Sequence, residues 1–292
     1  MVFKFKKMKK TVNFHLWEPC NMRCKFCFAT FQDVKNEVLP KGHLPKEQTL
    51  DVVRQLAASG FEKITFAGGE PTLCPWLPEL MALSTSLGMT TMLVTNGSRL
   101  SDEFLKQNQG NLHWIALSVD SVIDEINLQT GRAICGKKVI DFNEYKRIVD
   151  RIKQYGYRLK INTVVNRHNS NDNMISFIEY AKPERWKIFQ VLPVQGQNDN
   201  HIEELTISKE QFDAYLLKHE CVNEFTTMVP ENNHEMTASY LMIDPAGRFY
   251  DDSKGRHTYS EPILSVGVEK AVQQITFDAD RFLQRGGNYT WS

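Results

Sequence analysis

The chain has 292 residues, of which 41% are hydrophobic and 24% charged, so it can bury the core of one barrel-sized domain or of two small ones. Its 35 basic side chains balance 35 acidic ones, which predicts neither nucleic acid nor an anionic membrane as a partner. No apolar run approaches the ~20 residues of a membrane span. Six cysteines, three of them clustered, fit a reducing compartment. Residues 1–10 are basic but lack the apolar core of a leader peptide, so we expect a cytoplasmic protein.

Strands and helices are expected to alternate from residue 11 to residue 195. Short apolar runs, which alternate with polar residues at 11–17, predict strands at 11–17, 63–67, 90–95, 113–119, 158–165 and 186–193. Apolar residues spaced by three and four predict helices at 45–59, 77–87, 102–107 and 141–155, and a further helix that is capped by residues 169–172 and reaches about 181. This order predicts an α/β fold of parallel βαβ units, a partial or complete (β/α)6 barrel.

The pattern changes after residue 195. A polar loop at 195–200 precedes a helix at 209–218, and two short strands at 239–243 and 248–250 flank a turn that contains Gly247. A last helix is expected at 278–285. We therefore expect residues 11–195 to form the barrel, and residues 196–292 to form an extension that packs over its mouth.

Three cysteines, Cys20, Cys24 and Cys27, follow the first predicted strand. A closed zinc site needs four ligands, and an electron-transfer iron–sulfur cluster usually takes four cysteines. Three thiolates leave one iron of a four-iron cluster open to bind a small molecule. The spacing resembles the signature of radical S-adenosylmethionine (SAM) enzymes, which implies a [4Fe–4S] cluster and SAM as cofactors. The alternatives are three unrelated cysteines or a zinc knuckle that borrows His15.

A second motif, Gly68-Gly69-Glu70-Pro71, ends the second predicted strand. Two glycines let backbone carbonyls approach a ligand, and with the Glu70 carboxylate they supply the acceptors that an ammonium group needs. The radical SAM resemblance implies that this motif holds the methionyl amine, whereas the alternative is a plain strand-to-helix turn. The other expected SAM contacts are Asn96 for the ribose, Phe26 for the adenine, and Ser118 and Arg132 for the methionyl carboxylate.

Polar residues occupy one face of five predicted strands. Side chains alternate along a strand, and helices must cover the apolar face, so the polar face should look into the barrel. Isolated buried cations cost several kcal/mol or more, so we expect a polyanion as their counter-charge, such as a nucleoside triphosphate. For any single lysine, the alternative is that it reaches solvent at the rim. The polar face consists of Asn13 and His15, Lys63 and Thr65, Ser118 and Asp120, Lys160 and Asn162, and Arg185 and Lys187.

From about residue 12 onward the sequence resembles the viperin family, in its shorter forms without a membrane helix. The segment after Cys27, Phe28-Ala29-Thr30-Phe31, is most similar to prokaryotic viperin-like proteins. The resemblance is also carried by Asn13-Phe14-His15-Leu16, Lys160-Ile161-Asn162, Arg185-Trp186-Lys187-Ile188-Phe189-Gln190, Ser239-Tyr240-Leu241, Lys254-Gly255-Arg256 and Arg285-Gly286-Gly287.

This resemblance implies conversion of CTP to 3′-deoxy-3′,4′-didehydro-CTP, a chain terminator for viral polymerases. It implies a 5′-deoxyadenosyl radical that takes the C4′ hydrogen before the 3′-hydroxyl leaves, and an electron-donor protein of the flavodoxin or ferredoxin type. Prokaryotic relatives also use UTP or GTP, and the segment 232–236 departs from the animal pattern, which leaves the base open. The resemblance implies Tyr240 as the catalytic residue and Asn13, His15, Lys63, Lys160, Asn162, Arg185, Lys187, Lys254, Arg256 and Arg285 as substrate contacts.

Two other functions are compatible with parts of the sequence. A radical SAM enzyme that modifies a peptide often carries extra cysteine clusters in its C-terminal extension, where Cys221 stands alone here. A non-enzymatic module with zinc on the three cysteines is the second alternative.

Overall fold

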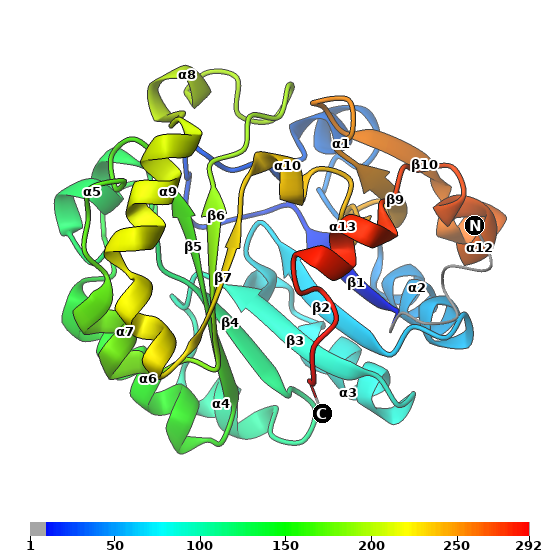
Figure 1. Cartoon of the computed structure of the whole chain (residues 1–292). Helices are drawn as coiled ribbons and strands as arrows, with labels where there is room; N and C mark the ends of the chain where they lie inside the picture. Colours follow the sequence, from blue (N-terminus) through cyan, green and yellow to red (C-terminus); the bar gives the residue numbers. More distant parts are fainter. Residues whose placement is uncertain (1–9, 292) are drawn as a thin grey trace.

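A computed structural model describes residues 10–291, and its centre is a single sheet. The strands are β1 (Thr11–Trp17), β2 (Lys63–Gly68), β3 (Thr90–Thr95), β4 (Trp114–Ser118), β5 (Arg158–Val165), β6 (Arg185–Gln190), β7 (Thr227–Glu231), β8 (Met242–Ile243), β9 (Arg248–Asp251) and β10 (Thr258–Pro262). The ten strands follow the order β10-β9-β8-β1-β2-β3-β4-β5-β6-β7. Strands β1 to β7 are parallel, and β9 runs antiparallel to β8 and β10. The edge strands β10 and β7 do not pair, so the barrel is partial and open (Figure 1).

Helices cover the outer face of the sheet (Figure 1). In α6 the side chains of Tyr145, Ile148 and Ile152 lie on one buried face, and Asp141 caps the first turn by accepting a hydrogen bond from the Glu144 amide. The helices are α1 (Gln32–Glu37), α2 (Lys46–Ala58), η2 (Pro71–Leu73), α3 (Leu77–Ser86), α4 (Asp102–Gln107), α5 (Asp124–Gln129), α6 (Phe142–Gln154), α7 (Ile175–Ala181), α8 (Ile202–Leu205), α9 (Lys209–Lys218), η3 (Glu220–Glu224), α10 (Asn233–Met236), α11 (Ile263–Val266), α12 (Val268–Val272) and α13 (Ala279–Gln284).

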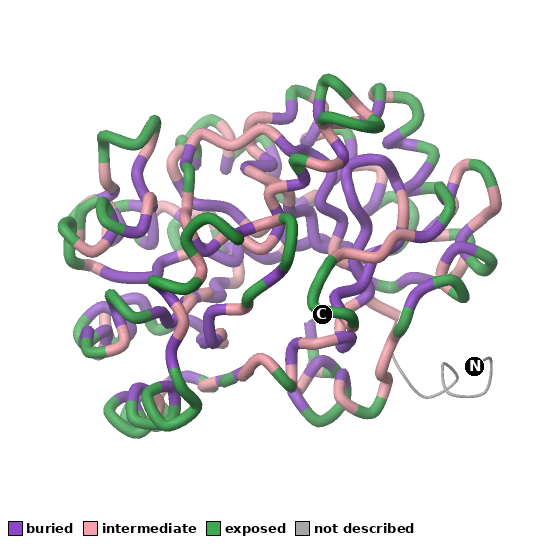
Figure 2. The backbone as a smooth tube through the Cα atoms, turned by 90° about the horizontal axis from the view of Figure 1, so that it is seen from above, coloured by how far each residue is buried: buried purple, intermediate pink, exposed green. Residues whose placement is uncertain are grey.

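The core lies between the sheet and its helices. Phe14, Ile64, Phe66 and Leu117 point outward from the barrel into this layer and are fully buried. Seen from above, the buried trace runs through the middle of the molecule and the exposed segments lie around it (Figure 2). The apolar side of each strand is therefore used for helix packing, which leaves the opposite, polar side to face the interior of the barrel.

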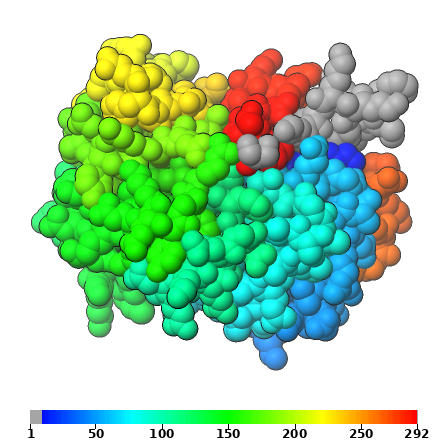
Figure 3. Space-filling view, turned by 90° about the horizontal axis from the view of Figure 1, so that it is seen from below, coloured from blue at the N-terminus to red at the C-terminus, as the bar shows by residue number. Residues whose placement is uncertain are grey.

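The C-terminal segment closes part of the open side of the barrel. The Trp114 indole N–H donates to the Trp291 carbonyl at 2.9 Å, and the Lys63 ammonium donates to the Tyr289 hydroxyl at 2.5 Å. Seen from below, atoms of this segment (red) lie between segments that are far away in the sequence (Figure 3). Residues after α13 thereby become part of the barrel interior.

The predicted fold class and the order of its first six strands are confirmed, and β1, β3, β5, α4 and α9 have the predicted bounds. Three details are wrong. The strand expected at 239–243 is confined to β8, Met242–Ile243. Residues 169–172 do not cap a helix, because Asn169 donates to the Asp120 carbonyl and Asp172 accepts from Ser121, so α7 begins only at Ile175. The sixth strand ends at residue 190 instead of 193. Extension strands β7–β10 join the main sheet.

Two further expectations concern the ends and surface of the chain. The basic segment 1–10 lies outside the described residues except for Lys10. Within residues 10–291, no helix has the length and apolar character that crossing a membrane requires.

Candidate functional site

A cavity of about 530 Å³ opens inside the partial barrel. It reaches from the polar face of the strands to the loops that follow their carboxyl ends, where functional groups gather in parallel α/β folds. The predicted site residues on its wall are Asn13, His15, Cys20, Cys24, Phe26, Cys27, Lys63, Gly68, Gly69, Glu70, Asn96, Ser118, Arg132, Lys160, Asn162, Lys187, Tyr240 and Arg285.

The three clustered cysteines share this wall as free thiols. Burial raises the pKa of Cys20, Cys24 and Cys27 to about 11, and each thiol also has its pKa raised by one of the others. A coordinated metal supplies the positive charge that ionises such thiols. Within residues 10–291, no three His, Cys, Asp or Glu side chains converge as ligands of a single metal ion. Three thiols are the number of protein ligands that a four-iron cluster with one open iron takes, whereas a closed zinc site needs a fourth ligand.

The cysteine loop is held in place by the turn after α5. The Cys135 amide donates to the Asn21 carbonyl at 2.7 Å, and the Arg23 amide donates to the Gly131 carbonyl at 3.3 Å. Gly131 has a φ of +78°, and a Cβ at this position would collide with the Arg23 carbonyl oxygen. A glycine is therefore required where the turn meets the cysteine loop.

Gly68 and Gly69 pack against the backbone of residues 17–19. The Gly69 amide donates to the Trp17 carbonyl at 2.5 Å, and a Cβ on Gly69 would lie 2.6 Å from the Pro19 carbonyl oxygen. The glycines thus allow the end of β2 to lie directly beside the start of the cysteine loop. Their predicted contact with a ligand stays a prediction.

Glu70 is buried, and most hydrogen-bond acceptor sites of its carboxylate are filled by donors of this chain. Oε1 accepts hydrogen bonds from the Thr72 amide at 3.1 Å, the Thr72 hydroxyl at 2.5 Å and the Thr95 hydroxyl at 2.7 Å. Oε2 accepts a single bond, from the Asn96 amide at 2.9 Å. Burial raises the pKa of Glu70, although these bonds oppose the shift. A carboxylate oxygen has two lone pairs, so Oε2 keeps one acceptor site beside the cavity, which fits an ammonium group.

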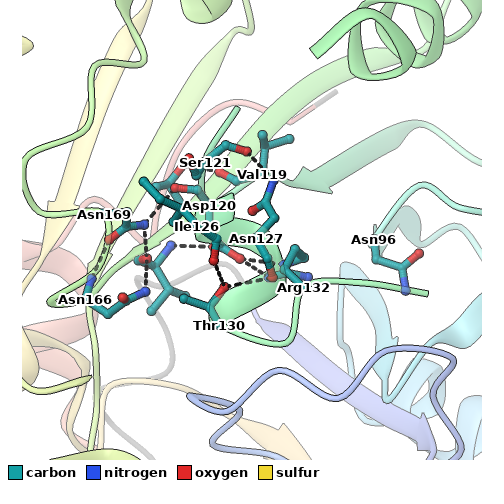
Figure 4. A network of polar contacts seen from close by, with 12 residues as sticks. Asn96, Val119, Asp120, Ser121, Ile126, Asn127, Thr130, Arg132, Asn166 and Asn169 are labelled. Atoms are coloured by element: carbon teal, nitrogen blue, oxygen red, sulfur yellow. Dashed lines mark hydrogen bonds and ion pairs between the residues drawn. The ribbon is translucent and has the colours of Figure 1, made fainter. Parts of the chain in front are cut away.

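Asn96 and Arg132 both contact partners within the protein. The Asn96 amide group donates to Asn21 Oδ1 at 2.9 Å and thereby braces the cysteine loop. Arg132 donates through Nε to Asp120 Oδ2 at 2.6 Å and forms a buried ion pair with it. Figure 4 shows Asp120 and Arg132 within one polar network, with Asn96 to one side. Within the described part of the chain no hydrogen bond engages Arg132 Nη1, and half-buried Ser118 lies on the same cavity wall.

Four buried cations line the inner part of the cavity: Lys63, Lys160, Lys187 and Arg285. The three lysines point inward, as the strand alternation predicts. Burial lowers the pKa of Lys160 to about 7, and it lowers the pKa values of Lys63 and Lys187 well below their ordinary value. The neighbouring cations lower these values further. Such a group of charges favours a multiply charged anion as its ligand.

One carboxylate, Glu231, faces these cations, and no sequence pattern predicted this contact. It is fully buried on β7, forms an ion pair with Lys187, and accepts from Arg285 Nη1 at 3.1 Å. The Tyr240 hydroxyl donates to Glu231 and accepts from Lys187. The expectation that the barrel cations have no protein counter-charge is therefore wrong for Lys187. In the described part of the chain, no carboxylate forms an ion pair with Lys63 or Lys160.

Three predicted substrate residues lie away from the cavity wall. The Arg185 guanidinium stacks on the Tyr289 ring, 4.1 Å from its centroid, and donates to the Gly286 carbonyl at 3.2 Å. The C-terminal segment therefore covers Arg185 and keeps it off the cavity wall. Arg285, which was also predicted as a substrate contact, does lie on the wall. Lys254 and Arg256 are exposed in the turn after β9, and their part in substrate binding stays a prediction.

His15 sits among aromatic rings, with ring centroids of Phe28, Phe31 and Tyr250 at 6.0, 5.4 and 5.8 Å. Burial and the nearby His257 lower the pKa of His15 to about 3, so the ring is neutral. Its Nδ1 is buried and has no hydrogen-bond partner among residues 10–291. His15 is thus a packed histidine on the cavity wall with one unsatisfied nitrogen.

The amino-acid sequence matches a known family and several named relatives. The family model of the radical SAM superfamily matches residues 18–181. An S-adenosylmethionine-dependent nucleotide dehydratase of Flammeovirga pacifica is 56% identical, over 96% of this chain and 96% of that protein. One from Lacinutrix mariniflava is 58% identical over 97% of this chain, which spans only 59% of that longer relative. The nucleotide dehydratase RSAD2 of Danio rerio is 36% identical, over 97% of this chain and 78% of that protein.

Solved structures of distant proteins share the architecture. Native anSMEcpe with bound AdoMet superposes with a TM-score of 0.69 at 15% identity, over 94% of this chain and 82% of that chain. Streptococcus suis SuiB bound to S-adenosylmethionine gives a TM-score of 0.64 at 16% identity, over 85% of this chain and 62% of that chain. At such identities the likeness shows the fold alone.

Proposed function

The chain belongs to the radical SAM superfamily and, within it, to the S-adenosylmethionine-dependent nucleotide dehydratases, and from this premise we propose that it dehydrates the ribose of a nucleoside triphosphate. The proposed substrate is CTP, and the proposed product is 3′-deoxy-3′,4′-didehydro-CTP. The observation that carries the proposal is the group of buried cations on the same cavity wall as three free thiols.

The family uses a [4Fe–4S] cluster with SAM, which when bound supply a carbon radical able to take a hydrogen atom from an unactivated carbon. Cys20, Cys24 and Cys27 would hold the cluster. The remaining acceptor site of Glu70 would bind the SAM amine, and Arg132 with Ser118 would bind its carboxylate. The other proposed SAM contacts are the backbone of Gly68 and Gly69, the Asn96 side chain for the ribose and the Phe26 ring for the adenine.

Lys63, Lys160, Lys187 and Arg285 would bind the triphosphate. Because the cations lie on different strands and on the C-terminal segment, a phosphate chain that contacts all of them is fixed in direction. This orientation holds the ribose between the cations and the cysteine loop, and such positioning accounts for a large share of enzymatic rate enhancement. Glu231 keeps Lys187 and Arg285 in place before the substrate arrives.

Asn162 and Tyr240 would contact the ribose. The Asn162 Oδ1 atom is buried beside the cavity and has no hydrogen-bond partner among the described residues, and a ribose hydroxyl that reached it would supply that partner. Burial raises the pKa of Tyr240 well above its ordinary value, so its hydroxyl keeps its proton. Placed between Lys187 and Glu231, that hydroxyl would supply a proton to the leaving 3′-hydroxyl, and the neighbouring lysine would restore it.

The proposed reaction also needs a one-electron donor protein, of the flavodoxin or ferredoxin type. A cytoplasmic location is proposed because cysteines on the cavity wall and at the surface are all free thiols, as expected in a reducing compartment.

The test is anaerobic release of 5′-deoxyadenosine by reconstituted protein with CTP, UTP, GTP or ATP, followed by the mass of the nucleotide product. We expect one nucleotide to stimulate release and to lose the mass of one water. Release that no nucleotide stimulates would refute the proposal. Zinc at one per chain without sulfide would favour a non-enzymatic module instead.

A further inference from the structure

Asp252, which directly follows β9, is a buried acid on the cavity wall to which the proposed reaction gives no role. It is 6% exposed. Its Oδ1 accepts a hydrogen bond from the Ala238 amide at 2.8 Å. Its Oδ2 has no hydrogen-bond partner in the described part of the chain and is not sealed off from the cavity. A fixed carboxylate therefore offers one open acceptor atom to a bound ligand.

The backbone that holds Asp252 is itself constrained. Ala238 has a φ of +57°, a left-handed conformation that is unfavourable for a residue with a Cβ. Its amide donates to Asp252, and its carbonyl accepts from the Asp278 amide at 2.7 Å. The Ala238 amide is thus held against one particular oxygen of Asp252, which leaves the other oxygen free.

No cation within residues 10–291 shifts the pKa of Asp252. Burial raises this pKa, and the neighbouring Asp251 raises it further. Lys187, in contrast, responds to Glu231, Arg285 and Lys160. A triphosphate among the cations would also be repelled by a second anion. A nucleotide whose phosphates contact the cations would therefore turn its uncharged base end, not its phosphates, toward Asp252.

We infer that Asp252 reads the base of the nucleotide, and that its free oxygen accepts a hydrogen bond from an exocyclic amino group. This rests on the proposed function and selects amino-bearing bases, with cytosine as the proposed one, over uracil. Cytosine presents an N4 amino donor where uracil presents the O4 acceptor, and carboxylates pair with the former. With uracil, the O4 atom and the free Asp252 oxygen would both be acceptors, and a buried polar group would be left unpaired. The cost of such an unpaired group lowers the affinity for the analogue.

The substitution Asp252→Asn tests this inference because the Ala238 amide would fix the orientation of the new side-chain amide. The Ala238 amide would hold the new amide oxygen, so the amide nitrogen would face the ligand and donate to O4 of uracil. We expect wild-type protein to prefer CTP over UTP in kcat/KM by at least about 10-fold. We expect D252N to shift the CTP-to-UTP ratio toward UTP by about 10- to 100-fold, mainly through KM and the dissociation constant.

Asp251→Asn is the matched control. It removes the same charge one residue earlier, where the carboxylate accepts bonds from Ser253 and from the Thr276 amide and does not line the cavity. We expect it to leave the ratio unchanged. Measurements with GTP and ATP separate cytosine from the other amino-bearing bases.

The two proposals can fail separately. Protein that no nucleotide binds or stimulates would refute the dehydratase proposal itself. If the wild-type protein has a kcat/KM for UTP equal to or higher than that for CTP, the proposed recognition of the base by Asp252 is refuted. This outcome does not depend on whether D252N folds. A folded D252N with the wild-type ratio would refute it as well.

Discussion

Glu231→Gln tests how the buried charges are balanced, because it removes a carboxylate and keeps the shape of the side chain. The Glu231 side chain is 0% exposed, and its partners Lys187 and Arg285 are 7% and 4% exposed. Removing one partner of a buried ion pair typically costs about 3–5 kcal/mol, since the other charge stays buried and unpaired. We expect the variant to lose ~3–5 kcal/mol of unfolding free energy at neutral pH without nucleotide.

The sign of the pH dependence follows from the pKa of Glu231. Burial opposes its ionisation, but Lys187 and Arg285 outweigh burial and hold the pKa below its ordinary value. Its stabilising contribution is therefore complete above the unfolded-state pKa of about 4.3 and is lost as the pH falls through the folded-state value. The difference between wild type and variant should shrink toward zero in that acidic range.

The assay is anaerobic urea unfolding of both proteins, with and without CTP. CTP should stabilise the variant more than the wild type, because its phosphates replace the missing carboxylate. Glu184→Gln is the matched control: its ion pair with Arg158 is 42% and 34% exposed, so we expect a loss below about 1 kcal/mol. Equal losses for the two variants would refute the reasoning.

Two further predictions concern Lys160 and Gly131. The pKa of about 7 for Lys160 predicts that kcat/KM for the nucleotide falls as pH rises through about 7, where the cation is lost, and that Lys160→Arg abolishes this step in the pH profile. Gly131→Ala should lower the iron and sulfide content after reconstitution, because the Cβ collides with Arg23. Gly136→Ala, at a φ of +70° with open space around it, should retain the wild-type content.

The sequence determines the parts of this molecule that depend on local periodicity. Strands β1 and β5 alternate polar and apolar residues over most of their length, so their bounds and their inward faces could be predicted, and the short apolar run of β3 sufficed to predict its bounds. The cysteine loop is local as well, because its three thiols lie within eight residues. One strand and one turn suffice to bring them to the same wall.

The counter-ion Glu231 and the position of Asp252 on the cavity wall could not be predicted, since both depend on pairing between distant segments. Glu231 ends β7, a five-residue strand that contains Pro230. Proline argues against a central strand but is tolerated at a sheet edge, and β7 is one of the two edge strands of the described sheet. Asp252 lines the cavity only because β8 pairs with β1 and β9 with β8. Arg185 was misplaced because Tyr289, about a hundred residues later, stacks on it.

The pairing of Glu231 explains how a cavity with excess positive charge can persist before substrate binds. A single carboxylate pairs with Lys187 and Arg285, while burial lowers the pKa values of Lys63, Lys160 and, despite this pairing, Lys187. The protein thus reduces the cost of buried charge partly by pairing and partly by releasing protons. By this proposal an entering triphosphate would raise the pKa of Lys63 and Lys160, so its binding would take up protons and restore their charge. The same lysines could then be tolerated in the empty cavity and still bind phosphate strongly.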